Sequence, residues 1–135
     1  MFYYKIIFIF FLFLNISSSN ASNIKNSAVI FMYHKFGISK YPTTSVTLDQ
    51  LEQHIKEFSK QKYSVESIEY IIDTIINDGN LPNNTIGISV DDADKSFYET
   101  GWPFFKENGL PVTLFVNTST IHKNNKNYLN WDQIR

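Results

Sequence analysis

The sequence of 135 residues contains no cysteine, and this absence excludes several kinds of chemistry. Disulfides, thiolate zinc sites, cysteine nucleophiles and lipid attachment through cysteine are all ruled out. Any bound metal must therefore be held by histidine, aspartate or glutamate side chains. The chain has only three histidines, so few residues of this type could serve as metal ligands.

An excess of charge of either sign is also missing. Twelve Lys and Arg residues face 13 Asp and Glu residues, and the formal net charge is −1. This balance gives no electrostatic reason to expect a polyanion, so no nucleic-acid partner is expected. Only four prolines and five glycines accompany 43% hydrophobic residues, which argues against disordered and collagen-like chains. The composition indicates a folded domain.

The first 21 residues have the pattern of a secretory signal peptide. Lys5 precedes an apolar run at residues 6–14, and small polar residues follow up to Ala21. The run is far shorter than the ~20 residues that a membrane-spanning helix needs. We expect cleavage after Ala21, export of residues 22–135, and a periplasmic or extracellular location. The alternative is an uncleaved membrane anchor.

The rest of the chain alternates predicted strands and helices. Strands are expected at residues 28–34, 63–65, 85–90 and 112–116, and helices at 48–61, 68–76, 95–108 and from 131 onward. Residues 35–46 are expected to form a long loop. The continuous apolar character of 28–34 predicts a strand that is covered on both faces. Strands separated by helical crossovers indicate a parallel sheet and an α/β fold.

Polar residues follow directly after three of the predicted strands. His34 ends the first, Asp91 and Asp92 follow the strand at 85–90, and Asn117 and Thr118 follow the strand at 112–116. In parallel α/β folds the carboxyl ends of the strands meet at one edge, where active sites form. One of two adjacent carboxylates can bind a cation while the other takes a proton from water.

Each of these residues also has a purely structural interpretation. Acidic residues gather in loops as helix caps, and Asp94 could cap the following helix. His34 could simply donate to a loop carbonyl. His54 lies in an amphipathic helix and His122 in a polar segment, and neither has a partner at metal-ligand spacing. The aromatic residues between 97 and 105 are expected to pack a helix on the sheet, with sugar stacking as an alternative for one of them.

Four sequence blocks in order resemble a known family. They are AVIFMYHKFG at 28–37, YPTTSVTLDQLEQHI at 41–55, IGISVDDADKSFYETGWPFFKENGLPVTLFV at 86–116, and YLNWDQIR at 128–135. Together they resemble the N-terminal half of a polysaccharide deacetylase of the NodB-homology type, also called carbohydrate esterase 4. The resemblance implies that residues 22–135 form the N-terminal part of a distorted (β/α) barrel, truncated relative to the family.

The resemblance also implies a chemistry and a set of roles. The family consists of hydrolases that remove N-acetyl groups from amino-sugar polymers such as chitin, poly-N-acetylglucosamine or peptidoglycan, with a divalent metal, most often zinc. Its first motif, commonly Thr-Phe-Asp-Asp-Gly, falls on residues 89–93. By this resemblance Asp91 is the catalytic base, Asp92 is a metal ligand and His34 lines the substrate pocket. Ser89, Val90 and Ala93 depart from the common form.

One part of the family pattern is missing. The metal site of the family is completed by a later His-x-x-x-His pair, and no such pair occurs in these 135 residues. Because catalytic zinc sites use about three protein ligands, we expect this chain to be inactive alone. The first interpretation is a truncated or split deacetylase, for which the missing C-terminal half would be a partner. The others are an exported carbohydrate-binding remnant without catalysis, and a structural fragment in which the Asp pair is a coincidence.

Overall fold

The computed structural model describes residues 26–123 and 125–135. The predicted signal peptide at 1–21 lies outside the described residues. Within them, no helix is both long and apolar enough to cross a membrane. The strands are β1 (Ala28–Tyr33), β2 (Lys35–Phe36), β3 (Ser45–Val46), β4 (Ser64–Val65), β5 (Thr85–Val90) and β6 (Thr113–Leu114). The helices are α1 (Leu48–Phe58), α2 (Ile68–Ile76), the π-helix η1 (Phe97–Gly101), α3 (Trp102–Glu107), α4 (Thr118–His122) and α5 (Trp131–Ile134).

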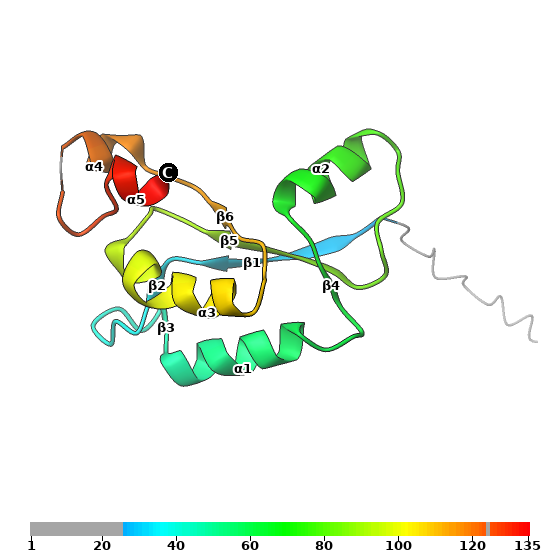
Figure 1. Ribbon diagram of the computed structural model, residues 1–135, viewed down its shortest axis with the longest axis horizontal. Coiled ribbons are helices and arrows are strands. Elements are labelled where there is room, and N and C mark those ends of the chain that lie inside the picture. Colours follow the sequence, from blue (N-terminus) through cyan, green and yellow to red (C-terminus); the bar gives the residue numbers. More distant parts are fainter. Residues whose placement is uncertain (1–25, 124) are drawn as a thin grey trace, which may run out of the picture.

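A parallel sheet forms the centre of the molecule, in the order β1-β5-β4, with β6 also paired to β5. All six residues of β5 are buried, as expected for a strand with the sequence TIGISV between two neighbours. Helices α1 and α3 lie on one side of the sheet and α2, α4 and α5 on the other (Figure 1). The expected α/β architecture with parallel strands is confirmed.

The main hydrophobic core lies between the sheet and the helices α1 and α3. Helix α1 begins with a capping box, in which Thr47 and Gln50 each bond the other's backbone N–H. Its apolar residues recur at helical spacing, and Leu51, Ile55 and Phe58 are buried against the sheet. The helix ends at Phe58, three residues before the predicted end.

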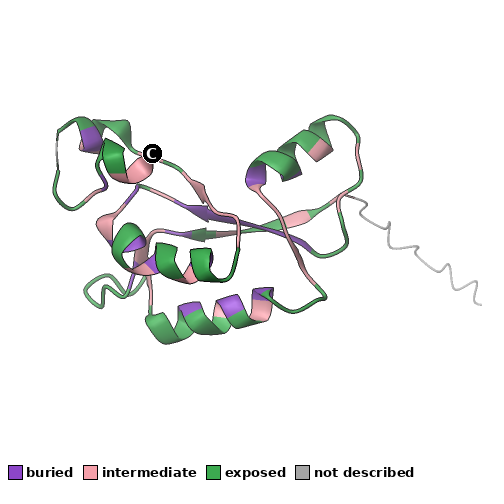
Figure 2. Cartoon of the chain, viewed as in Figure 1, coloured by how far each residue is buried: buried purple, intermediate pink, exposed green. Residues whose placement is uncertain are grey.

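Strand β1 is more exposed than its sequence predicts. Val29, Ile30 and Met32 have exposed fractions of 59%, 43% and 61%, so the expectation of a strand covered on both faces is wrong for this chain. Figure 2 shows the contrast between the largely exposed β1 and the buried β5 beside it. The reason is that β1 is an edge strand of the described sheet, with β5 as its only partner in the main sheet.

The second predicted helix forms, but it buries only part of its isoleucine stripe. Ile68 and Ile71 are buried, and both approach Gly87 of β5. Ile72, Ile75 and Ile76 are exposed instead of facing the core. A helix with this apolar stripe normally buries all of it, so α2 keeps an uncovered apolar side in this chain.

The segment predicted as one helix at 95–108 contains a wide turn. The Trp102 N–H donates to the Phe97 carbonyl five residues earlier, which makes η1 a π-helix. Pro103 lies in the first turn of α3, where its missing N–H does no harm. The wide turn allows the helix to resume at Trp102 despite the proline.

Three short elements occur where none was predicted. Strands β2 and β3 pair in parallel within the predicted loop at 35–46, and α4 forms at Thr118–His122. All three are too short to produce a periodic sequence pattern.

Candidate active site

The carboxyl ends of β1 and β5 lie side by side at one edge of the sheet. Tyr33 pairs with Val90, and the Asp91 N–H donates to the Tyr33 carbonyl at 2.8 Å, so the ladder continues beyond the strands. His34 and Asp91 are therefore neighbours, with backbones about 5 Å apart. Both residues are partly buried. The structure brings together these two predicted site residues, while their chemical roles remain predictions.

A sharp turn at Asp92 and Ala93 follows directly. Both residues have a left-handed backbone, with φ of 69° and 57°, a conformation that costs a residue with a side chain roughly 1–2 kcal/mol. Glycine adopts this φ freely, which gives a physical reason for the glycine that is common at position 93 of the family motif. The Ala93 carbonyl accepts a hydrogen bond from the Leu129 N–H at 2.9 Å. Asp92 is exposed, whereas Asp91 is partly buried, so the two carboxylates have different surroundings.

A third carboxylate, Asp94, fixes the loop that carries the other two. One of its oxygens lies 2.7 Å from the Lys35 ammonium, and the other accepts from the backbone N–H and the hydroxyl of Ser96. The Ser96 hydroxyl in turn accepts from the Phe36 N–H at 3.0 Å. This network ties the Asp91–Asp92 segment to β2. The capping contact suggested for Asp94 is therefore present, but the pairing with Lys35, 59 residues away in sequence, had no local signal.

The charges in this network stabilise each other. Burial alone would raise the pKa of Asp94, but the hydrogen bonds from Lys35 and Ser96 outweigh it and hold that pKa below its usual range. Burial alone would lower the pKa of Lys35, yet the hydrogen bond and charge of Asp94 raise it. Both groups are therefore ionised at neutral pH, and the loop is held by an ion pair.

The other polar candidates make contacts of their own, and Asn117 lies two residues after Phe115, whose N–H donates to the carbonyl of Val90 next to Asp91. His54 is not a simple surface residue, because its Nδ1 is 2.9 Å from the hydroxyl of the buried Tyr33. The ring of His122 lies 5.9 Å from that of Trp131. Asn117 starts α4, and its side chain accepts from the Ser119 hydroxyl. These contacts give each residue a structural role.

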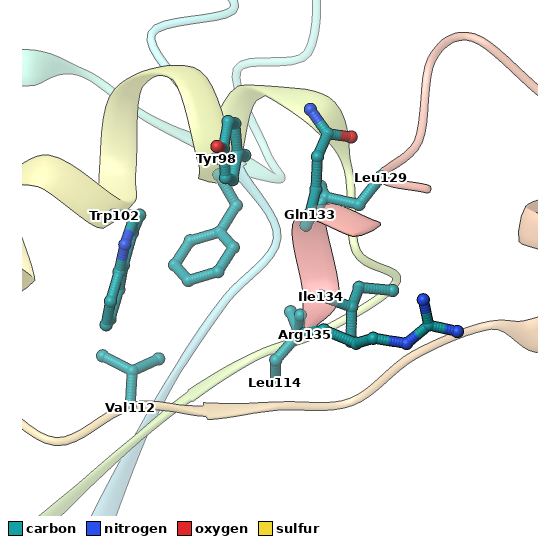
Figure 3. Close-up of a pocket in the computed structure, with 9 residues that line it drawn as sticks. Tyr98, Trp102, Val112, Leu114, Leu129, Gln133, Ile134 and Arg135 are labelled. Carbon is teal, nitrogen blue, oxygen red and sulfur yellow. The ribbon is translucent and has the colours of Figure 1, made fainter. Parts of the chain in front are cut away.

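The aromatic residues of η1 and α3 divide between the core and a surface hollow. Phe97 and Phe105 are buried in the core. Tyr98 and Trp102 are partly exposed, and they face a hollow of about 310 Å³ together with residues of β6 and α5 (Figure 3). This hollow contains neither His34 nor the Asp pair, so it is distinct from the candidate site.

The donor set for a metal is incomplete. Across residues 26–123 and 125–135, no three histidine, aspartate or glutamate side chains are grouped to hold a metal ion. A catalytic zinc needs about three protein ligands and one open position. The residues of this site therefore do not by themselves fit a zinc centre, and Asp92 is the one that the family pattern assigns to the metal.

The chain is similar in sequence to known N-deacetylases. No protein-family model matches the chain. The chain is 27% identical over 121 residues to poly-beta-1,6-N-acetyl-D-glucosamine N-deacetylases of Staphylococcus aureus, for example from strains MSSA476 and N315. That alignment covers 90% of this chain and 40% of each relative. The chain therefore spans less than half the length of these curated relatives.

Solved structures agree with the sequence comparison. The Streptococcus pyogenes deacetylase PplD superposes with a TM-score of 0.72 at 19% identity, over 82% of this chain and 51% of PplD. A de-N-acetylase from Aggregatibacter actinomycetemcomitans superposes with a TM-score of 0.70 at 20% identity, over 80% of this chain and 49% of that protein. These superpositions establish the fold alone. The chain thus has the fold of the N-terminal half of the polysaccharide deacetylases and sequence similarity to their poly-N-acetylglucosamine members, as its four sequence blocks indicate.

Proposed function

We propose that this chain supplies the carboxylate-bearing half of an active site that removes N-acetyl groups from an amino-sugar polymer. The observation that carries the proposal is the placement of Asp91 and Asp92 directly after the central strand β5, with His34 directly after the neighbouring strand β1. This is the edge of a parallel sheet at which α/β enzymes build their sites. The sequence and fold similarity to N-deacetylases supplies the reaction class.

Asp91 acts as the general base in this proposal. It is partly buried, and its backbone N–H donates to the Tyr33 carbonyl, which fixes the position of the backbone that carries the carboxylate. Asp91 takes a proton from that water as the oxygen attacks the acetamide carbonyl carbon. The carbon–nitrogen bond then breaks, the nitrogen gains a proton, and acetate and a free amino sugar result. His34, beside Asp91, lines the pocket that receives the sugar.

Asp92 contributes one ligand to a divalent metal, and the remaining ligands come from polypeptide beyond these 135 residues. When bound, the metal, most often zinc in the family, would act as a Lewis acid. Because the described residues do not complete its donor set, the present chain has no step of its own that runs through the metal. The chain is therefore inactive until the other half of the fold is supplied.

The substrate in this proposal is a poly-N-acetylglucosamine polymer. Relatives from Staphylococcus aureus bear the name of poly-beta-1,6-N-acetyl-D-glucosamine N-deacetylases, and PplD was solved with acetate, the expected product of such a reaction. Export through the signal peptide at 1–21 would bring the protein to the extracellular or periplasmic space, where such polymers are found.

The test compares the chain alone with an extended form. The full chain is assayed for acetate release from poly-β-1,6-N-acetylglucosamine oligomers, and again after extension at Arg135 with the remaining C-terminal half of the Staphylococcus aureus relative. We expect no release from the chain alone and chelator-sensitive release from the extended chain. Activity of the chain alone would contradict the ligand count. Sugar binding with no release in either form would instead favour a carbohydrate-binding protein without catalysis.

Substitutions in the extended chain separate the two aspartates. Asp91→Asn should retain the metal and lower turnover by on the order of 10²–10⁴-fold, the usual contribution of a general base. Asp92→Asn should weaken metal binding, measured by zinc content after dialysis. Asp73→Asn, which changes an exposed carboxylate on α2, is the matched control and should leave both properties unchanged. Equal losses in all three variants would refute these assignments.

A further inference from the structure

The turn that carries Asp91 and Asp92 is strained, so contacts at its two ends must hold it in place. Asp92 and Ala93 have φ of 69° and 57°, a backbone that is unfavourable for any residue with a side chain. Two such residues in succession persist only where the surrounding structure fixes them. The positions of both carboxylates therefore depend on what the ends of the turn contact.

A backbone hydrogen bond holds the start of the turn to β1. The Asp91 N–H donates to the Tyr33 carbonyl at 2.8 Å and continues the ladder between β1 and β5. This bond fixes the backbone of Asp91. It lies ahead of the two strained residues, so it cannot by itself fix Asp92.

The ion pair between Lys35 and Asp94 holds the end of the turn. Its nitrogen and oxygen are 2.7 Å apart, and the two side chains are only 18% and 14% exposed. Every other ion pair among the described residues joins side chains that are at least 40% exposed. Exposed pairs contribute little, whereas a shielded pair with a short hydrogen bond constrains both partners. The Lys35–Asp94 pair can therefore fix a position as well as add stability.

The two contacts lie on either side of His34 in the sequence. Tyr33 accepts the hydrogen bond from Asp91, and Lys35 pairs with Asp94. A segment that is held at one point can rotate about it, whereas a segment held at two points cannot. The bond and the ion pair together thus set the turn in one orientation relative to the end of β1 and to His34.

The segment at 127–129 contacts the same turn through backbone groups. The Leu129 N–H donates to the Ala93 carbonyl at 2.9 Å, and the Lys95 N–H donates to the Asn127 carbonyl at 3.0 Å. A substitution at position 94 leaves the donors and acceptors of these bonds in place. The contribution of the Asp94 carboxylate can therefore be measured separately from theirs.

We propose that Asp94 is a positioning residue of the candidate site, which acts through its ion pair with Lys35 to hold Asp91 and Asp92 in place relative to His34. Asp94 itself touches neither the sugar nor the metal. The proposal rests on the proposed function in one respect, namely that Asp91 and Asp92 are the carboxylates that act in the reaction. Because a displacement of about 1 Å can lower turnover on the order of 10²-fold, the pair contributes to the rate of the reaction.

The first test measures amide hydrogen exchange by NMR in the full chain, with and without Asp94→Asn. Asparagine keeps the oxygen that accepts from Ser96 and loses the charge that pairs with Lys35. We expect the N–H groups of Asp91 and Leu129 to exchange about 10-fold faster, as loss of a charged hydrogen bond provides. The N–H of Ile71, which donates to the Ser67 carbonyl in α2, should be unaffected.

Two results of the exchange experiment would overturn the proposal. Unchanged exchange at Asp91 would show that the ion pair does not hold the turn. Equal acceleration at Asp91 and Ile71 would show a general loss of stability, which gives Asp94 no positional role.

Further variants show whether the charge is responsible. Lys35→Met should reproduce the effect of Asp94→Asn, whereas Lys35→Arg keeps a positive charge and should retain slow exchange at Asp91. Glu99→Gln is the matched control, because it removes the exposed Lys95–Glu99 pair of 3.3 Å and should change nothing at Asp91. Equal effects of Lys35→Arg and Lys35→Met, or of Glu99→Gln and Asp94→Asn, would refute the assignment.

The second test measures turnover in the extended chain with excess zinc. Asp94→Asn should lower kcat about 10- to 100-fold and change KM by less than about twofold, because a displaced Asp91 loses an interaction made in the transition state. Adding Lys35→Met should cause little further loss, since both substitutions break one pair. Ser67→Ala removes the side-chain cap of α2 and should leave kcat per folded molecule unchanged. A raised KM with unchanged kcat would place the pair in sugar binding and overturn the proposal.

The outcome is separable from that of the proposed function, because the exchange experiment needs no activity. Faster exchange confined to the turn, together with an inactive extended chain, would refute the deacetylase proposal and support the role of the pair in holding the turn. An active extended chain in which Asp94→Asn has unchanged kcat would refute the positioning role alone.

Discussion

Two consecutive residues at the end of β1, Tyr33 and His34, have different surroundings because successive side chains point to opposite faces of a strand. Tyr33 is buried in the core, where its ring packs against those of Phe36 and Phe105. His34, the next residue, lies at the edge beside Asp91. The hydroxyl of Tyr33 lies 2.9 Å from Nδ1 of His54 on α1, so one histidine contacts Tyr33 through its side chain and another, His34, follows it in the chain.

Tyr33 predicts a specific loss of stability at high pH. Burial raises the pKa of Tyr33 from 10.0 to about 12. The folded state therefore keeps the proton that the unfolded chain releases, so the stabilisation is complete below pH 10 and is lost as the pH rises toward 12. Two pKa units correspond to roughly 2–3 kcal/mol. Urea unfolding at pH 9 to 11.5 should show this loss in the unchanged chain.

Two phenylalanine variants provide the comparison for the alkaline measurement. Tyr33→Phe should cost about 1 kcal/mol at neutral pH, because the hydrogen bond to His54 is lost, and should show a shallower decline above pH 10. Tyr70→Phe, which changes an exposed tyrosine of α2, should leave the decline as it is. An identical pH profile for Tyr33→Phe and the unchanged chain would contradict the role given to burial.

The sequence was sufficient to place His34 and Asp91 together, but not to find the Lys35–Asp94 pair. Two polar residues that directly follow apolar strands of a parallel sheet must meet at one edge, so strand pattern alone predicts their proximity. Lys35 begins the two-residue strand β2 and Asp94 lies in the turn after β5, and neither segment is long enough to have a periodic pattern that would reveal the pair. The same limit applies to the left-handed turn at Asp92 and Ala93.

At the scale of elements, the η1–α3 helix is positioned by a close contact between Gly101 and Phe36. Gly101, the last residue of the π-helix, has its backbone against the ring of Phe36 from β2. Phe36 in turn contacts the rings of Phe97 and Phe105 on the same helix. Helical periodicity predicted the segment from 95 to 108, whereas the π-turn depends on Pro103 and on this contact between elements.

Gly101→Ala should therefore destabilise the fold even though alanine favours helices. A Cβ at this position would lie 2.7 Å from Cδ1 of Phe36, and Phe36 is buried among other rings and cannot move aside freely. We expect a loss of about 1–3 kcal/mol in the free energy of unfolding, as is usual for overpacking. Helix propensity alone would predict a gain of about 1 kcal/mol, so the sign of the change decides between the two effects.

A double-mutant cycle identifies the cause of that loss. In a Phe36→Leu background the same Gly101→Ala change should cost less, because the smaller side chain leaves room for the added methyl group. Additive effects of the two substitutions, measured by urea unfolding, would show that the contact with Phe36 is not the cause.

At the scale of the whole molecule, β1 and α2 leave large apolar side chains uncovered within the described residues. The apolar residues Val29 and Met32 of β1 and Ile76 of α2 are all more than half exposed. Their sequence patterns predicted burial. An apolar pattern indicates that a side chain packs against other apolar groups, but it does not identify the segment that covers it. The chain spans about half of the solved structures that it resembles, so the fold of those proteins contains further polypeptide.

The exposed edge of β1 predicts self-association of the chain, because a hydrophobic edge strand is a template for pairing with another strand. Met32→Lys should reduce it, since a lysine on an edge strand opposes such pairing. The unfolding free energy should change by less than about 0.5 kcal/mol, because Met32 is already 61% exposed. Sedimentation of the full chain at increasing concentration measures the association. Gln53→Lys adds the same charge to an exposed site on α1 and should leave the association unchanged, so an equal effect of both variants would point to net charge.

In the extended chain Met32→Lys should lower the yield of active enzyme while Gln53→Lys does not, because a residue that is harmless on an open edge becomes disruptive once another segment packs against it.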